Sequence, residues 1–176
     1  MDRQLEIINR HASTLPIRID QLIRDLGLRY IPDAPLPPNI SGQLKLLRNG
    51  SYEISTAVGE PVTRQRFTAA HELGHYILHR SMISNGVDDD TKYRSTSAGD
   101  FYNTRIELAH ERQANSFAAQ ILMPEKLLKE QIKSTKSLRE LAQQFNVSPQ
   151  SMRWRLKNLD LISFVADDVP ARAYAF

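Results

Sequence analysis

The stretch that decides the fold is PVTRQRFTAAHELGHYILH, residues 61–79. Proline suits the first turn of a helix, where its missing N–H is not needed, and the preceding Glu60 complements the helix dipole. We therefore expect one helix from about Val62 to His79. Its apolar residues, which indicate that it is largely buried, are Phe67, Ala69, Ala70, Leu73, Ile77 and Leu78.

The centre of this helix has the pattern H-E-x-x-H, with His71 and His75 one turn apart. Positions i and i+4 lie about 6 Å apart along a helix, so both imidazoles can bind one metal ion at about 2.1 Å. Glu72 is displaced by about 100° from His71, which places its carboxylate beside the ion, where a general base for the attacking water belongs. Three fixed residues also occur by chance, but without a metal this buried group would be costly to desolvate.

A metal site of this kind needs a third protein ligand and one open position for water. His79 lies about 12 Å from His71 along a straight helix, too far to share the ion, and we interpret it as a packing residue or a partner of a ligand. The longer pattern with a third histidine ten positions after the first is absent, because that position is Ser81. Three candidates remain on a second helix, predicted from about Arg105 to Leu122: Glu107, His110 and Glu111.

Two long segments occur in a fixed order: RFTAAHELGHYILH at residues 66–79 and ERQANSFAAQILMP at residues 111–124. Together they closely resemble the ImmA/IrrE family of metallopeptidases, and the resemblance extends from about Leu15 to Ile162. In that family the glutamate that opens the second motif is the third metal ligand, which the resemblance carries onto Glu111. Asn115 follows one turn later and would orient Glu111 or a ligand histidine, unless it only caps or faces solvent.

This resemblance implies an α+β fold with a zincin-like core, in which a small antiparallel sheet accompanies the H-E-x-x-H helix. A helical, helix-turn-helix-like part follows the core. The implied activity is that of a zinc-dependent endopeptidase, with manganese or iron as other metals that such ligands accept. Several family members cleave a helix-turn-helix repressor encoded beside them, in stress response, mobile-element induction or toxin–antitoxin control. The expected partner is therefore a protein substrate, a repressor or an antitoxin.

Other parts of the first 124 residues also have local signals. Ile17 to Leu26 predicts a short amphipathic helix ended by Gly27, and the proline-rich segment Pro32 to Pro38 predicts no regular structure. Asn49-Gly50 lies between two β-prone runs and indicates a tight hairpin. We expect its second strand, Tyr52 to Val58, to hold an extended substrate as an edge strand, although these residues can equally be core. Residues 84–104 predict a long polar loop, either a lid or an insertion.

The last third of the chain predicts short helices. Leu127, Leu128 and Ile132 mark one of them, the capping box Ser137 to Glu140 opens the next, and Ser148-Pro149 begins another. The last two helices, joined by a short turn, look like a helix-turn-helix. We expect a metallopeptidase core over residues 1–124, a helical part over 125–162 and a tail over 163–176, together forming one compact unit.

Composition restricts the compartment and the partners. The 176 residues contain no cysteine, which excludes a disulfide framework and a thiolate metal site. The N-terminus lacks the pattern of a secretory signal, and no apolar stretch approaches the roughly 20 residues of a membrane span. We therefore expect a cytoplasmic protein without a membrane partner. A net charge of +3 is too small to indicate nucleic acid by itself.

Two other functions fit parts of the sequence. A DNA-binding regulator would use residues 148–158 as its recognition helix, with Arg153, Arg155 and Lys157 facing phosphates, but apolar residues interrupt that helix's polar face. A metal-binding module without activity would recognise a partner through its cleft, but it would not need Glu72. A peptidase also needs a partner for the developing oxyanion, for which the candidates are Tyr93, Tyr102 and His110.

Overall fold

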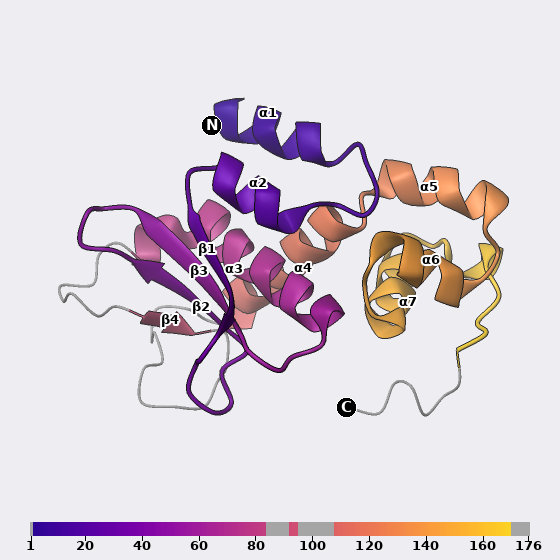
Figure 1. The fold of residues 1–176 in the computed structure, drawn as a ribbon. Helices are drawn as coiled ribbons and strands as arrows, with labels where there is room; N and C mark the ends of the chain where they lie inside the picture. The colour runs from indigo at the N-terminus through magenta and orange to yellow at the C-terminus, as the bar shows by residue number, and fades with distance from the viewer. Residues whose placement is uncertain (1, 84–91, 95–107, 170–176) are drawn as a thin grey trace.

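The computed structural model describes residues 2–83, 92–94 and 108–169, and it has a mixed α+β fold (Figure 1). A four-stranded sheet lies at one end and a group of short helices at the other. None of the described helices combines the length and the apolar character that a membrane span requires. The helices are α1 Asp2–His11, α2 Ile19–Asp25, α3 Val62–Ile83, α4 Leu108–Leu122, α5 Glu125–Ser134, α6 Leu138–Phe145 and α7 Pro149–Asn158, and the strands are β1 Arg29–Ala34, β2 Gly42–Leu46, β3 Tyr52–Ala57 and β4 Lys92–Arg94.

The predicted hairpin is confirmed by β2 and β3, which pair antiparallel. Gly50 in the turn has φ +80°, a conformation that glycine adopts without the steric cost of a Cβ. The Asn49 side chain accepts a hydrogen bond from the Ser51 backbone N–H at 3.0 Å. Turn chemistry therefore sets the register of these two strands.

The sheet differs from the prediction in its pairing. Its order is β1-β3-β2-β4, and β1 runs parallel to β3, so the sheet is mixed and not antiparallel. Because β3 is paired on both sides, our prediction that it holds substrate as an edge strand is wrong. Ser55 in this strand is only 5% exposed, as expected for a central strand. Among the described strands, β1 and β4 form the two edges.

The proline-rich segment also contains more regular structure than predicted, because β1 runs through Pro32 to Ala34. Proline has no N–H to donate, which an edge strand tolerates and a central strand does not. The pairing with β3 shifts register between Ile31 and Ala34, and Asp33 has φ 52°. An edge position with a local irregularity is therefore what accommodates Pro32.

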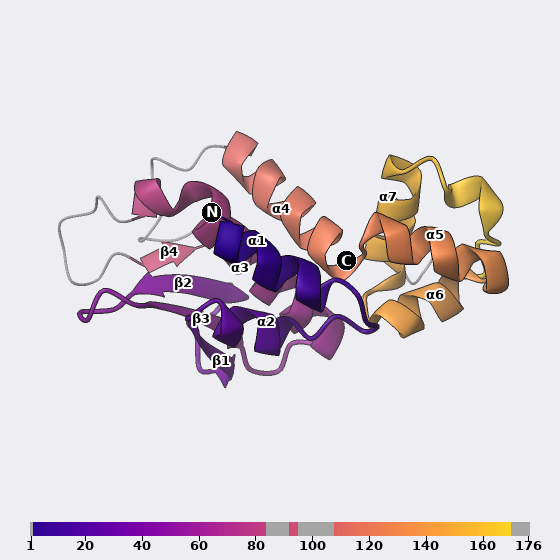
Figure 2. The same ribbon diagram turned by 90° about the horizontal axis from the view of Figure 1, so that it is seen from above.

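Helix α3 packs against β2 and β3 on one side and against α4 on the other (Figure 2). Its buried face includes Ala69, Ala70 and Leu73, all fully buried. The α3 and α4 backbones approach closely at Gly74, where an added Cβ would lie 3.1 Å from the Ala114 Cα. Small residues on both helices, Gly74 and Ala114, therefore let the two backbones approach closely.

Helices α5, α6 and α7 gather at the end of the molecule away from the sheet (Figures 1 and 2). The predicted start of α6 is confirmed, with Ser137 as its N-cap, since the Ser137 hydroxyl accepts a hydrogen bond from the Glu140 N–H. Arg66 of α3 joins this end to the core, because its guanidinium donates to the Asn146 carbonyl at 2.9 Å and to the Ile17 carbonyl at 2.8 Å. One half-buried side chain thus connects three segments that are distant in sequence.

Candidate metal centre

Three of the predicted site residues meet between α3 and α4. The Nε2 atoms of His71 and His75 lie 3.0 Å apart. The Glu111 carboxylate reaches both of them, with one oxygen 3.3 Å from His71 and the other 3.4 Å from His75. The candidate ligand atoms all lie within 4.8 Å of one another. This group is the only cluster of this kind found among the described residues.

The close approach of the two helices explains why Glu111 lies here. His71 and His75 are one turn apart on α3, with Gly74 beside the second histidine. Since the Ala114 backbone packs on Gly74, the first turn of α4 lies directly over the histidine pair. Glu111 is one turn before Ala114 on the same helix, so its side chain is directed at the two rings. A bulkier residue at Gly74 would separate them.

Hydrogen bonds from α4 determine which ring nitrogens carry protons. The Asn115 side-chain oxygen lies 2.9 Å from the His71 Nδ1, so that nitrogen donates. The Gln113 oxygen lies 2.8 Å from the His79 Nε2, which therefore donates and leaves the His79 Nδ1 as an acceptor in a neutral ring. That acceptor lies 3.0 Å from the His75 Nδ1, so His75 must donate to it. When both rings are neutral, the metal-facing Nε2 atoms of His71 and His75 therefore each carry a lone pair.

This arrangement of atoms fits a metal cation. Two imidazole lone pairs and a carboxylate converge on one point, where only a positively charged species relieves their repulsion. Ligand atoms about 2.1 Å from one ion at tetrahedral angles would be about 3.4 Å apart. The separations of 3.0, 3.3 and 3.4 Å between the candidate atoms are close to that value. The donor set therefore has the chemistry and the dimensions of a metal site with one open position.

The two histidines have different proton affinities. Burial lowers the pKa of His75 to about 4, even though Glu111 acts in the opposite direction. Burial also acts to lower the pKa of His71, but the hydrogen bond to Glu111 and the charges of Glu72 and Glu111 outweigh it, so this pKa is raised. At neutral pH His75 is therefore the neutral ring that a metal ion requires.

Glu72 is fully buried on α3 beneath the start of β2. A Cβ added at Gly42 would lie 3.2 Å from a Glu72 carboxylate oxygen and 2.2 Å from the Thr68 methyl group. Gly42 therefore lets the strand approach the helix closely above this carboxylate. No sequence pattern that we considered indicated a role for Gly42, because the contact depends on where β2 crosses α3.

Of the other candidates from the sequence, only His110 has a side chain that the structure describes, and it does not join the cluster. His110 lies beside His79, with ring centroids 4.9 Å apart, and it is not one of the three clustered ligands. Tyr93 lies in β4, where its backbone pairs with Leu44. Glu107 and Tyr102 lie outside the described residues, as does most of the predicted polar loop. The interpretation of His79 as a partner of a ligand agrees with its contact with His75.

Comparison with known proteins decides the family. The model of the peptidase M78 family, described as the IrrE N-terminal-like domain, matches residues 43–157. This chain belongs to that family. The match includes both helices of the metal centre and most of the C-terminal helices, as the ImmA/IrrE resemblance led us to expect.

Two similar proteins extend this comparison. The radiation response metalloprotease IrrE of Deinococcus radiodurans is 37% identical over 155 residues, which cover 76% of this chain and 44% of that protein. A transcriptional regulator of Mycobacterium tuberculosis has a similar fold, with TM-score 0.57 and 17% identity over 89% of this chain and 47% of its own. The chain thus spans less than half the length of either protein.

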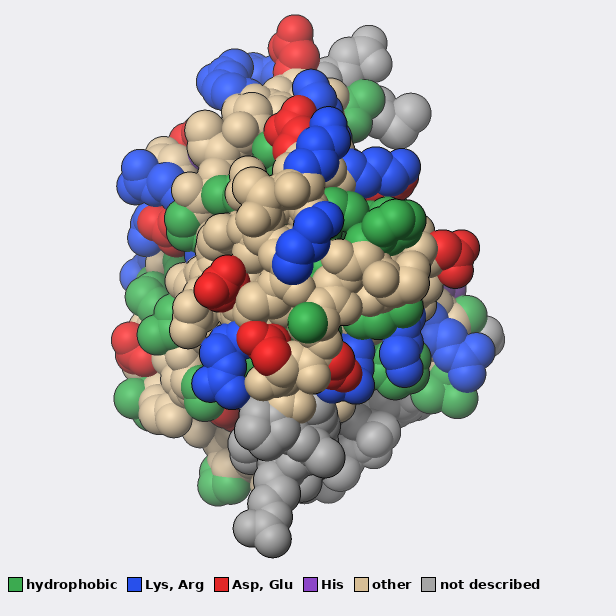
Figure 3. All heavy atoms as spheres, turned by 90° about the vertical axis from the view of Figure 1, so that its right-hand side faces the viewer, with side chains coloured by type: hydrophobic (Ala, Val, Ile, Leu, Met, Phe, Trp, Pro, Cys, Tyr) green, Lys and Arg blue, Asp and Glu red, His purple; other side chains and the backbone are tan. Residues whose placement is uncertain are grey.

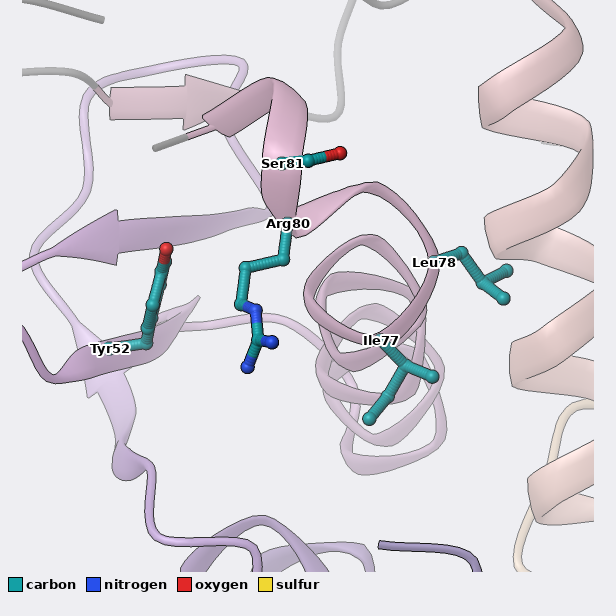
Figure 4. Close-up of a pocket in the computed structure, with 5 residues that line it drawn as sticks. All are labelled: Tyr52, Ile77, Leu78, Arg80 and Ser81. Atoms are coloured by element: carbon teal, nitrogen blue, oxygen red, sulfur yellow. The ribbon is translucent and has the colours of Figure 1, made fainter. Parts of the chain in front are cut away.

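The candidate metal centre of this M78-family chain borders a hollow of about 250 Å³, lined by His71, Glu111 and Asn115 among others. A larger hollow of about 550 Å³ lies beside the end of α3, where Arg80 and Tyr52 face each other (Figure 4). Its lining contains none of the predicted site residues. The smaller hollow is therefore the one from which a substrate would reach the site.

Gln113 is, like Gly42, a contributor to this centre that the sequence patterns did not indicate. Its position two residues after Glu111 was inside the recognised motif, but nothing in the spacing indicated that it reaches His79 on another helix. The signal that would have found it is the third histidine of α3, which needs a polar partner when buried. His79 is 3% exposed and does have such a partner.

Proposed function

We propose that this chain is a zinc-dependent endopeptidase, with the metal held by His71, His75 and Glu111 and with Glu72 as the general base. The observation that supports this most is the convergence of two imidazole nitrogens and a carboxylate from two helices. The family is one of metallopeptidases, which agrees with this chemistry. Two imidazoles, one carboxylate and a fourth position left for water are the ligand set of many catalytic zinc sites.

Bound zinc would act as a Lewis acid that polarises the substrate carbonyl and lowers the pKa of water. Side chains of the protein carry out the proton transfers. Glu72 takes the proton of the attacking water and then passes it to the nitrogen of the leaving amine. Its charge acts to raise the pKa of the neighbouring ligand His71. Its complete burial holds the carboxylate in place.

The residues around the ligands hold them in the form that binds a metal. Asn115 accepts the Nδ1 proton of His71, and the chain from Gln113 through His79 accepts that of His75. Both Nε2 atoms are thereby kept as electron-pair donors that point at the ion. We assign Asn115, His79 and Gln113 as positioning residues, since they act through the ligands.

The substrate that we propose is a protein with a helix-turn-helix, a repressor or an antitoxin. This proposal is supported by the ImmA/IrrE resemblance and by the relative named a radiation response metalloprotease. We further propose that residues 1–124 form a zincin-like catalytic core and that residues 125–162 form a helix-turn-helix-like part. In this scheme the second part assists substrate recognition and residues 163–176 are a tail.

Direct DNA binding receives less support from the structure. On α7, Arg153 forms an ion pair with Asp167, and Arg155 donates a hydrogen bond to the Met123 carbonyl at 3.0 Å. Lys157 lies over the Trp154 ring, 5.8 Å from its centroid. The face of the molecule formed by α5 to α7 mixes basic and acidic side chains and has no single basic patch (Figure 3). These cations are therefore largely engaged within the chain.

The test measures metal content and cleavage together. Wild type, Glu72→Gln and Glu111→Ala would each be purified, assayed for metal and incubated with the helix-turn-helix protein encoded next to this one. We expect about one zinc per chain in wild type, retained without cleavage in Glu72→Gln and weakened in Glu111→Ala. Glu130→Ala, an exposed glutamate on α5, is the control and should behave as wild type. Absence of metal from wild type grown with zinc would refute the proposal.

A further inference from the structure

The hollow at the metal centre adjoins two others. It shares Phe67 and Asn115 with a hollow of about 330 Å³ that reaches α7, which we name the α7 arm. It shares Ser41 and Arg64 with a hollow of about 460 Å³ beside the Leu36–Ile40 loop, which we name the loop arm. Three adjoining hollows thus follow one another past the metal centre. An endopeptidase needs binding surface of this extent, because its substrate continues in both directions from the cleaved bond.

The α7 arm combines aromatic rings with positive charge. Trp154 is 61% exposed although it is a large apolar side chain, and Phe67 lines the same hollow. Arg112 and Arg155 are the charged residues in the lining, which contains no carboxylate. Arg112 is exposed on α4, and no carboxylate of the described residues pairs with it. Exposed aromatic and arginine side chains together are typical of surfaces that recognise a partner.

Contacts within the chain hold the α7 arm in place. The guanidinium of Arg155 bonds the Met123 carbonyl, which fixes α7 against the end of α4, and Glu125 lies close enough for its charge to act on Arg155. Asn115 lines the α7 arm and also accepts a hydrogen bond from His71. The arm is therefore preorganised and begins one side chain away from the metal centre.

The loop arm has different chemistry. Its two charged lining residues, Glu60 and Arg64, pair with each other at 3.2 Å and so compensate one another. Ser41 adds hydrogen bonds to both of these side chains. The loop arm therefore has no charge of its own to offer. Selectivity for a charged substrate residue must come from the α7 arm.

We propose that the α7 arm binds an extended substrate segment that carries an acidic side chain next to an aromatic or aliphatic one. Arg112 pairs with the acidic group, and Trp154 and Phe67 pack against the apolar one. This inference rests on the proposed peptidase function and names its substrate class. A single-stranded nucleic acid is also attracted to arginine and tryptophan. The peptide is favoured because the arm adjoins the hollow at the metal centre and its charge is limited to two guanidinium groups.

Binding would be measured on the Glu72→Gln protein, which should bind a peptide without cleaving it. The probes are three fluorescein-labelled decapeptides. The first contains glutamates and phenylalanines among alanines. In the second each glutamate is replaced by lysine, and in the third each phenylalanine is replaced by alanine. A labelled oligothymidine is the fourth probe. Anisotropy reports affinity. Trp154 is the only tryptophan of the chain, so titration with unlabelled peptide, followed by its emission, reports binding at this place.

The first peptide should bind at least about tenfold more tightly than the other three probes, since like charges and missing anchors each cost this much or more. It should also shift the Trp154 emission. Arg112→Glu should lose this preference by about tenfold or reverse it towards the lysine peptide, and Trp154→Ala should weaken binding of the first peptide. Lys133→Glu makes the same charge change on an exposed part of α5 outside the three hollows and should have no effect.

Equal affinity for the three peptides, or an acidic preference that survives in Arg112→Glu, would overturn this inference. Stronger binding of the oligothymidine would assign the arm to nucleic acid instead. Failure of the peptidase proposal looks different: the zinc-loaded wild type would cleave neither the peptides nor the neighbouring helix-turn-helix protein while the Trp154 response persists. Cleavage that does not depend on Arg112 or Trp154 would support the peptidase proposal and refute substrate binding by the α7 arm.

Discussion

Replacement of Gln113 by leucine should weaken metal binding although Gln113 does not contact the metal. Its side-chain oxygen is 2.8 Å from the His79 Nε2, and that contact keeps the His79 Nδ1 free of a proton. Leucine has similar volume and no acceptor. His79 can then carry its proton on Nδ1, which faces the His75 Nδ1 at 3.0 Å. Two donors cannot face each other, so His75 shifts its proton to Nε2 and blocks its metal-binding atom.

The size of this effect follows from the length of the chain of contacts. Loss of a direct partner of a metal-bound histidine costs about 10–100-fold in metal affinity, or about 1.4–2.8 kcal/mol. Gln113 is one residue further away, because it acts through His79. We therefore expect Gln113→Leu to lose metal affinity by about tenfold, the lower end of this range. Gln113→Glu keeps an acceptor oxygen and should bind zinc within about threefold of wild type.

The assay is competition for zinc against a chromogenic chelator, with nitrogen NMR of the imidazoles to identify the protonated atom. Gln120→Leu is the matched control, because Gln120 is exposed on the same helix and bonds only Ser116, at 3.0 Å, among the described contacts. Equal zinc affinity of Gln113→Leu and Gln120→Leu would refute the predicted shift of the His75 proton. An unchanged His75 tautomer in Gln113→Leu would refute it as well.

Three further predictions concern the scaffold of the site. Gly42→Ala should destabilise the fold by about 1–3 kcal/mol in urea unfolding, because its Cβ would overlap the Thr68 methyl at 2.2 Å. The additional substitution Thr68→Ser removes that methyl and should restore stability. An equally unstable double variant would contradict the overlap. Arg66→Met should cost about 2–4 kcal/mol, since it removes both charge-assisted hydrogen bonds to backbone carbonyls; an unchanged melting curve would count against this tether. Hydrogen bonds from the Ser137 hydroxyl and the Arg139 N–H lower the pKa of Asp168 below its ordinary value of 3.8, so the stability that this carboxylate adds is complete above that value and is lost as the pH falls through the lower folded value. The difference in stability between wild type and Asp168→Asn should therefore be constant near neutral pH and narrow below about pH 4 in metal-free protein, whereas a difference that widens on acidification would have the wrong sign.

Local patterns in the sequence determined much of what surrounds the site. The spacing of His71 and His75 predicted one helix with both rings on one face, and Asn49-Gly50 predicted the β2–β3 hairpin. The capping box at Ser137 predicted the start of α6. Each of these signals is complete within a few residues, because helix periodicity, turn geometry and capping depend on neighbours in the chain. In the same way, the two longer motifs at residues 66–79 and 111–124 indicated the family.

Only the tertiary structure decided what depends on segments distant in sequence. It placed β3 in the centre of the sheet and allowed Pro32 in β1, because strand neighbours are chosen by packing and not by the strand's own residues. It brought Glu111, and not His110, to the two histidines through the contact of Gly74 with Ala114. The same packing of α4 on α3 joined Gln113 to His79. A side chain's partner across two helices is set by how closely their backbones approach, and no single segment of sequence contains that distance.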